Sequence, residues 1–192
     1  IDNQQALNGL DPRGNEVDQS NKFGLEIDQT LSPLITIKNS GQFRKKYVES
    51  TVSPLRNRDV KGWWNEIQLQ VKLSESLDFD LGLMGGFDSG NQQGKLFSSQ
   101  AYGLLLNGRF FFKKTGRFQS QISWVNVAEK KKSPYLPPEA LNGFPVGTSF
   151  HSNTRLQYFL NRSVSMIFTL NTIDDSRYNN FITFRGEIRA HF

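Results

Sequence analysis

Apolar and polar residues alternate with a period of two over most of the chain from Trp63 to its end. In residues 77–87 the odd positions are Leu, Phe, Leu, Leu, Gly and Phe, and the positions between them are Asp, Asp, Gly, Met and Gly. Such alternation is typical of β-strands, because successive side chains point to opposite faces of a sheet. The sequence therefore predicts an all-β protein of antiparallel strands, each with one apolar and one polar face.

The predicted connections between these strands are of two lengths. Short turns are predicted at 74–76, 113–116 and 161–163. Longer polar loops are predicted at 88–98, 128–147 and 173–180. Short and long connections alternate along the chain, so all the long loops would lie at one end of the sheet. Outer-membrane β-barrels have this arrangement, with short periplasmic turns and long extracellular loops.

The strand signal is weaker before Trp63. Residues 1–21 are polar and rich in Gly and Asn, so we expect a loop or extension there, followed by barrel strands over 22–192. Two of these strands are predicted at about 22–30 and 34–48, which gives nine strands, or seven without these two. A complete single-chain bacterial barrel has an even number. We therefore expect the C-terminal part of a larger antiparallel transmembrane β-barrel, with a complete eight-stranded barrel as the alternative.

Three features favour a barrel in a membrane over a soluble one. The predicted polar face is mostly Gln, Asn, Ser, Thr and Gly, whereas a soluble surface would carry more Lys and Glu. A strand of about eleven residues, tilted by about 40°, rises roughly 28 Å, close to the apolar band of such barrels. Aromatic residues gather near predicted strand ends, as in the girdles at membrane interfaces. These residues are Trp63, Trp64, Tyr102, Trp124 and Phe192.

Composition narrows the possible classes further. The chain has 192 residues, of which 36% are hydrophobic, with 16 Phe and no Cys. No run approaches the roughly 18 consecutive apolar residues of a transmembrane helix, and the lack of cysteine excludes disulfides and Cys-based metal or redox sites. The net charge of +5 has the sign of a nucleic-acid binder. However, the basic residues do not cluster with stacking aromatics, so we expect no nucleic-acid partner.

The last predicted strand is apolar on one side and polar on the other. Its apolar positions are Ile182, Phe184, Gly186, Ile188, Ala190 and Phe192. A register slip of one residue would turn arginines toward lipid, at about 2–4 kcal/mol for each Arg near the bilayer midplane. This strand resembles the C-terminal sorting signal of bacterial outer-membrane β-barrel proteins, and we assign Phe184, Ile188 and Phe192 to that signal.

Three short segments extend this resemblance. Residues 142–144, 155–158 and 186–190 look like the C-terminal end of large barrels in Bacteroidota. The resemblance implies a location in the outer membrane of a Gram-negative bacterium and contact with outer-membrane lipid. It also implies recognition by the barrel-assembly machinery during insertion. It carries no information about a substrate.

The polar face would line the interior of such a barrel. Its charged and titratable residues are Glu66, Asp78, Asp80, Arg109, His151, Arg155, Arg185, Glu187 and Arg189. They could set the ion selectivity of a pore, or they could form a salt-bridged lining that only solvates the interior. We expect a non-enzymatic, porin-like barrel that transports solutes, or an anchor that carries other outer-membrane or surface proteins.

Two other functions remain as alternatives. His151, next to Ser149 on the polar face, could support acyl hydrolysis, which would make the chain an outer-membrane lipid or peptide hydrolase. A soluble lipocalin-like ligand-binding barrel alternates in the same way, with inside and outside exchanged. Asp88 and residues 174–175 lie in predicted loops, but their spacing matches no EF-hand. We predict no catalytic residue, no metal ligand and no cofactor.

Overall fold

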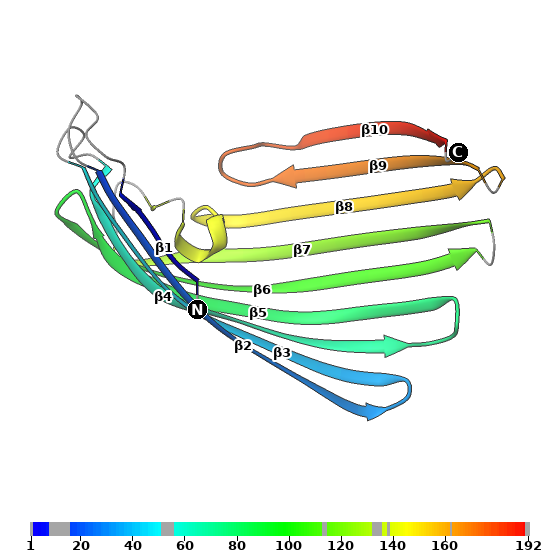
Figure 1. The fold of residues 1–192 in the computed structure, drawn as a ribbon, viewed down its shortest axis with the longest axis horizontal. Helices are drawn as coiled ribbons and strands as arrows, with labels where there is room; N and C mark the ends of the chain where they lie inside the picture. The colour runs from blue at the N-terminus through cyan, green and yellow to red at the C-terminus, as the bar shows by residue number, and fades with distance from the viewer. Residues whose placement is uncertain are drawn as a thin grey trace.

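In the computed structural model, ten antiparallel strands form one sheet in which spatial neighbours follow the order of the chain (Figure 1). The structure describes residues 2–7, 16–50, 56–112, 115–131, 136–137, 139–161 and 163–190. The strands are β1 (Asp2–Leu7), β2 (Glu16–Ser32), β3 (Ile35–Ser50), β4 (Arg58–Lys72), β5 (Leu77–Gln92), β6 (Lys95–Phe112), β7 (Gly116–Lys131), β8 (Gly147–Phe159), β9 (Val164–Asp174) and β10 (Phe181–Ala190). The all-β antiparallel class predicted from the alternation is confirmed.

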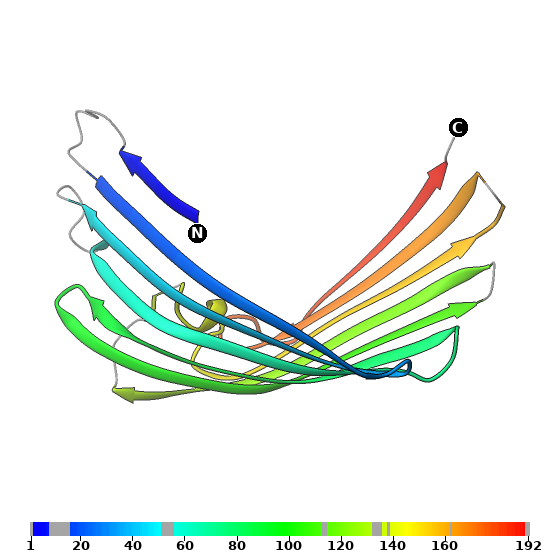
Figure 2. The ribbon, with the colours of Figure 1, turned by 60° about the horizontal axis from the view of Figure 1, so that its bottom comes forward.

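The sheet is bent into an open trough, with β1 at one edge and β10 at the other (Figure 2). In the part of the chain that the structure describes, β1 pairs only with β2 and β10 only with β9. The sheet therefore does not close on itself. A short 3-10 helix, η2 (Ala140–Gly143), lies on the concave side (Figure 2). No helix among the described residues is long and apolar enough to cross a membrane.

The prediction of a polar loop or extension over 1–21 is wrong for most of that range. Asp2–Leu7 forms β1, which pairs with residues 17–22 of β2, and β2 itself begins at Glu16. Backbone hydrogen bonds between strands do not require apolar side chains. A polar strand pair therefore gives no alternation for sequence analysis to detect. Residues 8–15 lie outside the described part of the chain.

The long loop predicted at 88–98 is also wrong. β5 and β6 continue through this range and are joined by a two-residue turn, Gln93–Gly94. Both turn residues have positive φ angles, 54° and 78°. These angles suit the tight primed turns of β-hairpins, which accept Gly and polar residues at their centre. The Gly, Asn and Gln content that suggested a loop belongs instead to a polar extension of the hairpin.

Connection lengths still differ between the two ends of the trough. At one end, β2–β3, β4–β5, β6–β7 and β8–β9 are each joined by at most four residues, as the strand bounds show. At the other end, β7 and β8 are separated by 132–146, and β9 and β10 by 175–180. The Gln93–Gly94 turn lies at this second end and breaks the strict alternation of short and long connections. We call the two ends the turn end and the loop end.

The two faces of the sheet differ in chemistry. Most of the exposed large hydrophobic side chains lie on the convex face, among them Phe23, Trp63, Leu83, Leu104 and Phe184. Most of the buried apolar side chains instead lie on the concave face, in two small clusters around η2. The molecule is therefore inverted relative to a soluble sandwich or barrel, because its largest apolar surface faces outward.

Candidate functional site

All nine charged and titratable residues predicted for the polar face lie on the concave face of the trough. The register pairs Asp78 with Arg109 across β5 and β6, and it places Arg155 one strand from the Gln119 that neighbours Arg109. Because alternate residues of a strand face the same way, the register also places six other residues on this face: Glu66, Asp80, His151, Arg185, Glu187 and Arg189. The sequence therefore identified a shared face correctly; that the face lines an aqueous lumen stays a prediction.

Polar residues, mostly with uncharged amide side chains, form a continuous row across the middle of this face, which we call the amide row. The row runs through Gln70, Asp80, Asn107, Gln121, Asn153, Asn171 and Thr183, each paired with the next in the register. Asn153 donates a hydrogen bond to Asn171, whose own side-chain amide donates to Thr183 Oγ1 at 3.3 Å. Amide side chains of this kind can bind water and polar solutes without carrying charge.

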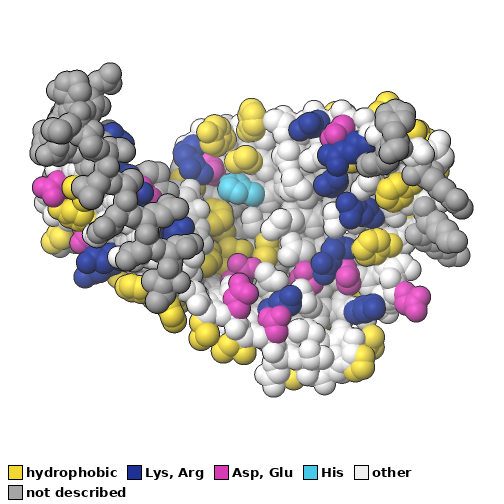
Figure 3. Space-filling view, in the orientation of Figure 1, with side chains coloured by type: hydrophobic (Ala, Val, Ile, Leu, Met, Phe, Trp, Pro, Cys, Tyr) yellow, Lys and Arg dark blue, Asp and Glu magenta, His cyan; other side chains and the backbone are white. Residues whose placement is uncertain are grey.

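Toward the turn end, the concave face of β5–β10 is basic. Five arginines (Arg109, Arg117, Arg155, Arg185 and Arg189) share it with three carboxylates (Asp78, Asp80 and Glu187). Arg109 pairs with Asp78 at 2.9 Å and with Asp80 at 3.5 Å, and Arg189 pairs with Glu187 at 2.7 Å. The Nε atom of Arg155 is buried without a hydrogen-bond partner among the described residues. The region thus combines ion pairs with a small excess of positive charge (Figure 3).

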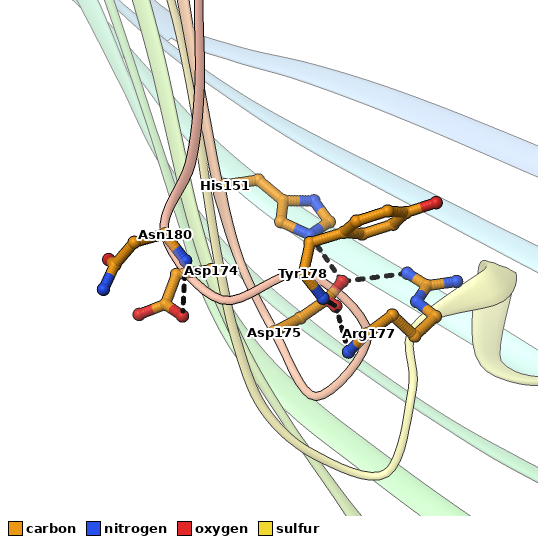
Figure 4. A network of polar contacts seen from close by, with 6 residues as sticks. All are labelled: His151, Asp174, Asp175, Arg177, Tyr178 and Asn180. Atoms are coloured by element: carbon orange, nitrogen blue, oxygen red, sulfur yellow. Dashed lines mark hydrogen bonds and ion pairs between the residues drawn. The ribbon is translucent and has the colours of Figure 1, made fainter.

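His151 lies near the loop end, beside the connection between β9 and β10. Its Nε2 atom is 3.4 Å from Asp175 Oδ2 (Figure 4). Its ring also stacks on Phe144, with ring centroids 5.5 Å apart. Ser149 is buried on the same face, but among the described residues its hydroxyl has no hydrogen-bond partner. The geometry therefore gives no Ser–His pair of the kind that acyl hydrolysis requires.

Asp175 organises the loop between β9 and β10. Its carboxylate accepts hydrogen bonds from the backbone N–H groups of Arg177 and Tyr178, at 2.7 and 3.0 Å, and from Arg177 Nη2 at 2.9 Å (Figure 4). Burial alone would raise the pKa of Asp175. The hydrogen bonds and the charge of Arg177 outweigh burial and lower this pKa from 3.8 to about 2. The carboxylate is therefore a fixed anion that holds the loop.

A segment between β7 and β8 folds back onto the concave face. We call its described part, residues 136–137 and 139–146, the inner loop. Its η2 helix contacts β4, β5 and β6. Leu141 is fully buried in a cluster with concave-face side chains that include Trp64 and Val127. The loop predicted at 128–147 is thus confirmed as a connection, but this part of it lies inside the trough.

Charged side chains hold the inner loop at two points. Arg58 donates two hydrogen bonds to the Glu139 carboxylate, at 3.1 and 2.5 Å. Arg44 donates to Asn142 Oδ1 at 2.6 Å and to Asp88 Oδ2 at 2.5 Å. Asp88 Oδ2 also accepts a hydrogen bond from the backbone N–H of Leu141. These contacts join the inner loop to β3, β4 and β5.

Trp64 corrects the predicted aromatic girdle. Trp63 is exposed on the convex face, where Tyr102 and Trp124 also form an edge-to-face pair. Trp64 instead points to the concave face, where it is buried and stacks on Phe144 with ring centroids 6.0 Å apart. Adjacent strand residues must point to opposite faces, so only one of the two tryptophans could belong to the girdle. Trp64 occupies a position that the alternation assigns to the polar face, and this was the signal that sequence analysis missed.

Two glycines lie beneath the buried side chains of Asp88 and Trp64. A methyl group at Gly62 would overlap the Asp88 carboxylate, and one at Gly86 would contact the Trp64 ring. Gly62 and Gly86 lie directly across the register from Asp88 and Trp64, respectively. Only a residue without a Cβ leaves room for these side chains to lie flat over the neighbouring strand. Gly62, Gly86, Asp88 and Trp64 thus form the part of the sheet on which the inner loop lies, and we call this part the seat.

Polar grooves remain open beside the inner loop. One groove of about 520 Å³ is bordered by Glu26, Gln42, Trp64, Glu66 and Asn142, among other residues. A second groove, of about 300 Å³, lies toward the turn end and is bordered by Asp80, Arg109 and residues of the amide row. Within the described ranges, no group of three or more His, Asp or Glu residues is arranged to hold a metal ion.

The residues assigned to the sorting signal are placed in part. Phe184 and Ile188 lie on the convex face of β10 and are about 70% exposed, at 70% and 71%. Phe192 lies outside the described residues. The sorting function itself stays a prediction. Comparison with protein-family models and with curated proteins found no match to this chain.

Proposed function

We propose that this chain forms the wall of an outer-membrane β-barrel through which small hydrophilic solutes pass. The observation that carries the proposal is the two-sided trough, in which bulky apolar side chains cover the convex face and amides and charges cover the concave face. In a membrane barrel, the outer surface contacts acyl chains and the polar interior contacts water. Each face then meets the solvent that its side chains favour.

The height of the apolar surface supports this proposal. On β5, the convex apolar positions run from Leu77 to Phe87. These ten residue steps, tilted by about 40°, rise roughly 25 Å, which is the height of the apolar band of outer-membrane barrels. Beyond Phe87, the convex face of the same strands carries polar residues such as Lys61 and Ser89. On β4 and β5, the apolar surface therefore ends where a bilayer of ordinary thickness would end; on β6, Leu96 is an exposed apolar residue beyond that level.

Lipid places one further requirement on the trough. An unpaired strand edge cannot lie in the hydrocarbon region, because its N–H and C=O groups would have no partners. In the working protein, the edges formed by β1 and β10 must therefore pair with each other or with further strands. Either arrangement keeps the concave face inside.

Two other functions receive less support. A surface anchor would need the same two-sided wall, but it would not need an open, hydrated interior, and the grooves on the concave face favour a passage. A lipocalin-like binder would need an apolar interior, whereas the middle of the concave face is an amide row. The absence of a Ser149–His151 contact in the described structure gives no support to hydrolysis.

Reconstitution tests the proposal. The protein should acquire its β-sheet circular dichroism only when detergent or lipid is present, and in planar bilayers it should give discrete conductance steps. Folding in plain buffer would contradict the membrane location. Folding in lipid with no conductance at any voltage would leave the anchor as the function.

We also propose that the barrel-assembly machinery recognises the C-terminal strand. Phe192→Ala should slow assembly into lipid vesicles that contain this machinery, and His191→Ala should not. In vesicles without the machinery, the two variants should insert equally fast. Equal assembly rates in both kinds of vesicle would contradict the proposal.

A further inference from the structure

We propose that the inner loop is the size-limiting constriction of this passage. Two ion pairs, Arg44–Asp88 and Arg58–Glu139, hold it across the interior, and we call them the anchors. The proposal rests on the proposed function, because a constriction has meaning only if solutes pass. It adds a specific element that sets which solutes fit.

The first support is the position of the inner loop. η2 contacts β4, β5 and β6, which are the central strands of the trough, and it lies within the concavity (Figure 2). A connection that only joined two strands would stay at the rim, in water. The inner loop instead covers the concave face of the central strands near the loop end, and residues of the amide row still border an open groove.

The second support is the seat, which is incomplete without the inner loop. Asp88 is fully buried, and it contacts the Arg44 guanidinium and the Leu141 N–H. A buried carboxylate that loses one of its few partners is strongly disfavoured. Removing the inner loop would take the Leu141 N–H from Asp88 and Asn142 from Arg44. The buried pair on the wall therefore favours the seated position of the loop.

The third support is the backbone of the inner loop. Leu141, Asn142 and Gly143 have consecutive positive φ angles of 49°, 56° and 82°. Non-glycine residues rarely adopt this conformation unless surrounding contacts impose it. The contacts that impose it are the buried Leu141 side chain and the hydrogen bonds to Asp88 and Arg44. The shape of the loop and the geometry of the wall thus depend on each other.

The surroundings of the inner loop indicate which solutes could pass. The adjoining groove of about 520 Å³ is bordered by Glu26, Gln42, Glu66 and Asn142, so its wall offers carboxylates and amides. Such a wall suits small hydrophilic solutes that can exchange hydrogen bonds with it. Folded proteins and bulky apolar molecules would be excluded while the loop is seated.

Because the chain has no cysteine, a single introduced thiol can report on the loop. Both Ala140 and Val146 belong to the inner loop, but Ala140 is fully buried against the wall, whereas Val146 is exposed. In the protein reconstituted in lipid, Ala140→Cys should react with a polar maleimide at least tenfold more slowly than Val146→Cys. The double substitution Arg44→Gln and Arg58→Gln should remove most of this difference. Equal rates at the two positions before any anchor is removed would overturn the seated arrangement.

Conductance then tests the constriction itself. Removing the two anchors should raise single-channel conductance several-fold and admit larger polyethylene glycols. Lys61→Gln is the control, because it removes an exposed cation from the convex face, outside the passage and away from the inner loop. If the anchor variant does not fold, Gly62→Ala replaces it, with Gly108→Ala as its control, since an added methyl meets the Asp88 carboxylate only at Gly62.

The outcomes separate the two proposals. Equal conductance in all variants, with faster labelling of Ala140→Cys after anchor removal, would reject the constriction and leave the passage intact. The absence of any conductance in every variant would reject both the passage and the constriction, even if Ala140→Cys is labelled more slowly than Val146→Cys. A parallel rise of labelling and conductance supports both.

Discussion

At the scale of single residues, Asp88 shows how the concave face is held together. Its carboxylate joins Arg44 on one strand to the backbone of Leu141 in the inner loop, and Gly62 provides the space in which it lies. One buried acid therefore connects two strands and a connection that are far apart in the sequence. Such residues respond to small changes in volume as well as to changes in charge.

Gly62→Ala should destabilise the protein by about 1–3 kcal/mol, the usual effect of forcing extra volume into a packed site. The added methyl would overlap the Asp88 carboxylate and the backbone carbonyl oxygen of Phe87, and displacing the carboxylate would break its contacts with Arg44 and Leu141. The measurement is the free energy of unfolding in urea, with the protein in detergent micelles or vesicles. Gly108→Ala is the control, because a methyl there meets open space. Equal stability of the two variants would contradict this account of the seat.

The loop around Asp175 should respond to acid in a narrow range. Because the folded-state pKa is lowered to about 2 from 3.8, this carboxylate contributes its full stabilisation above about pH 4. The contribution is lost as the pH falls toward 2. The amide signals of Arg177 and Tyr178 should therefore shift between pH 4 and 2 in NMR spectra. Asp175→Asn should remove that transition; if the shift persists in the variant, another group is responsible.

The residues that sequence analysis misplaced share a physical reason. Asp88 was predicted to lie in a loop and Trp64 to lie in the aromatic girdle, yet both are buried on the concave face. Their partners, Leu141 and Phe144, come from more than fifty residues away. Local patterns of polarity contain no information about such contacts. The face of a residue is a local property and was predictable; its partner was not.

At the scale of elements, each strand separates two environments. The alternation that predicted the strands also assigned the apolar residues to one face and the charged residues to the other, and the register agrees. Strand ends were harder to place, because most of β1 and the last residues of β5 are polar on both faces. Where neither face meets an apolar medium, the sequence loses the contrast on which the prediction depends.

The adjacent positions Ile67 and Gln68 test which face meets lipid. Ile67 is exposed on the convex face, and Gln68 lies on the concave face beside Glu66. Ile67→Arg should destabilise the protein in bilayers by about 2–4 kcal/mol, the value for Arg near the midplane of a barrel's outer surface. Gln68→Arg should have a much smaller effect, because its charge stays in water near a carboxylate. Reversible unfolding from vesicles gives both free energies of unfolding. A larger loss of stability in Gln68→Arg than in Ile67→Arg would mean that lipid contacts the concave face.

At the scale of the whole molecule, the trough has a polar interior with an uneven distribution of charge. The excess of arginine over carboxylate toward the turn end would attract anions to one part of the passage. This distribution emerges only when the strands are assembled, since the five arginines come from four different strands. Sequence analysis could predict the face of each arginine, but the balance between free charges and ion pairs required their neighbours.

The passage should therefore prefer anions weakly, and Arg155 should contribute to that preference. Its Nε atom has no hydrogen-bond partner among the residues described, whereas the Nε atoms of Arg109 and Arg189 each donate to a carboxylate. Arg155→Gln should shift the reversal potential in a salt gradient toward cations, whereas Arg155→Lys should leave it nearly unchanged. An unchanged potential in Arg155→Gln would mean that the interior is a neutral, salt-bridged lining.

The β5–β6 hairpin extends beyond the rest of the apolar surface. After Phe87, β5 continues to Gln92, and at a tilt of about 40° these five residues rise roughly 13 Å. The turn at Gln93–Gly94 would then stand clear of the lipid headgroups as a stiff projection. If the chain lies in the outer membrane as proposed, with its loop end outside the cell, this turn would be accessible to antibodies and bacteriophages, and its two-residue tip would be a place to insert an epitope for following the protein on intact cells.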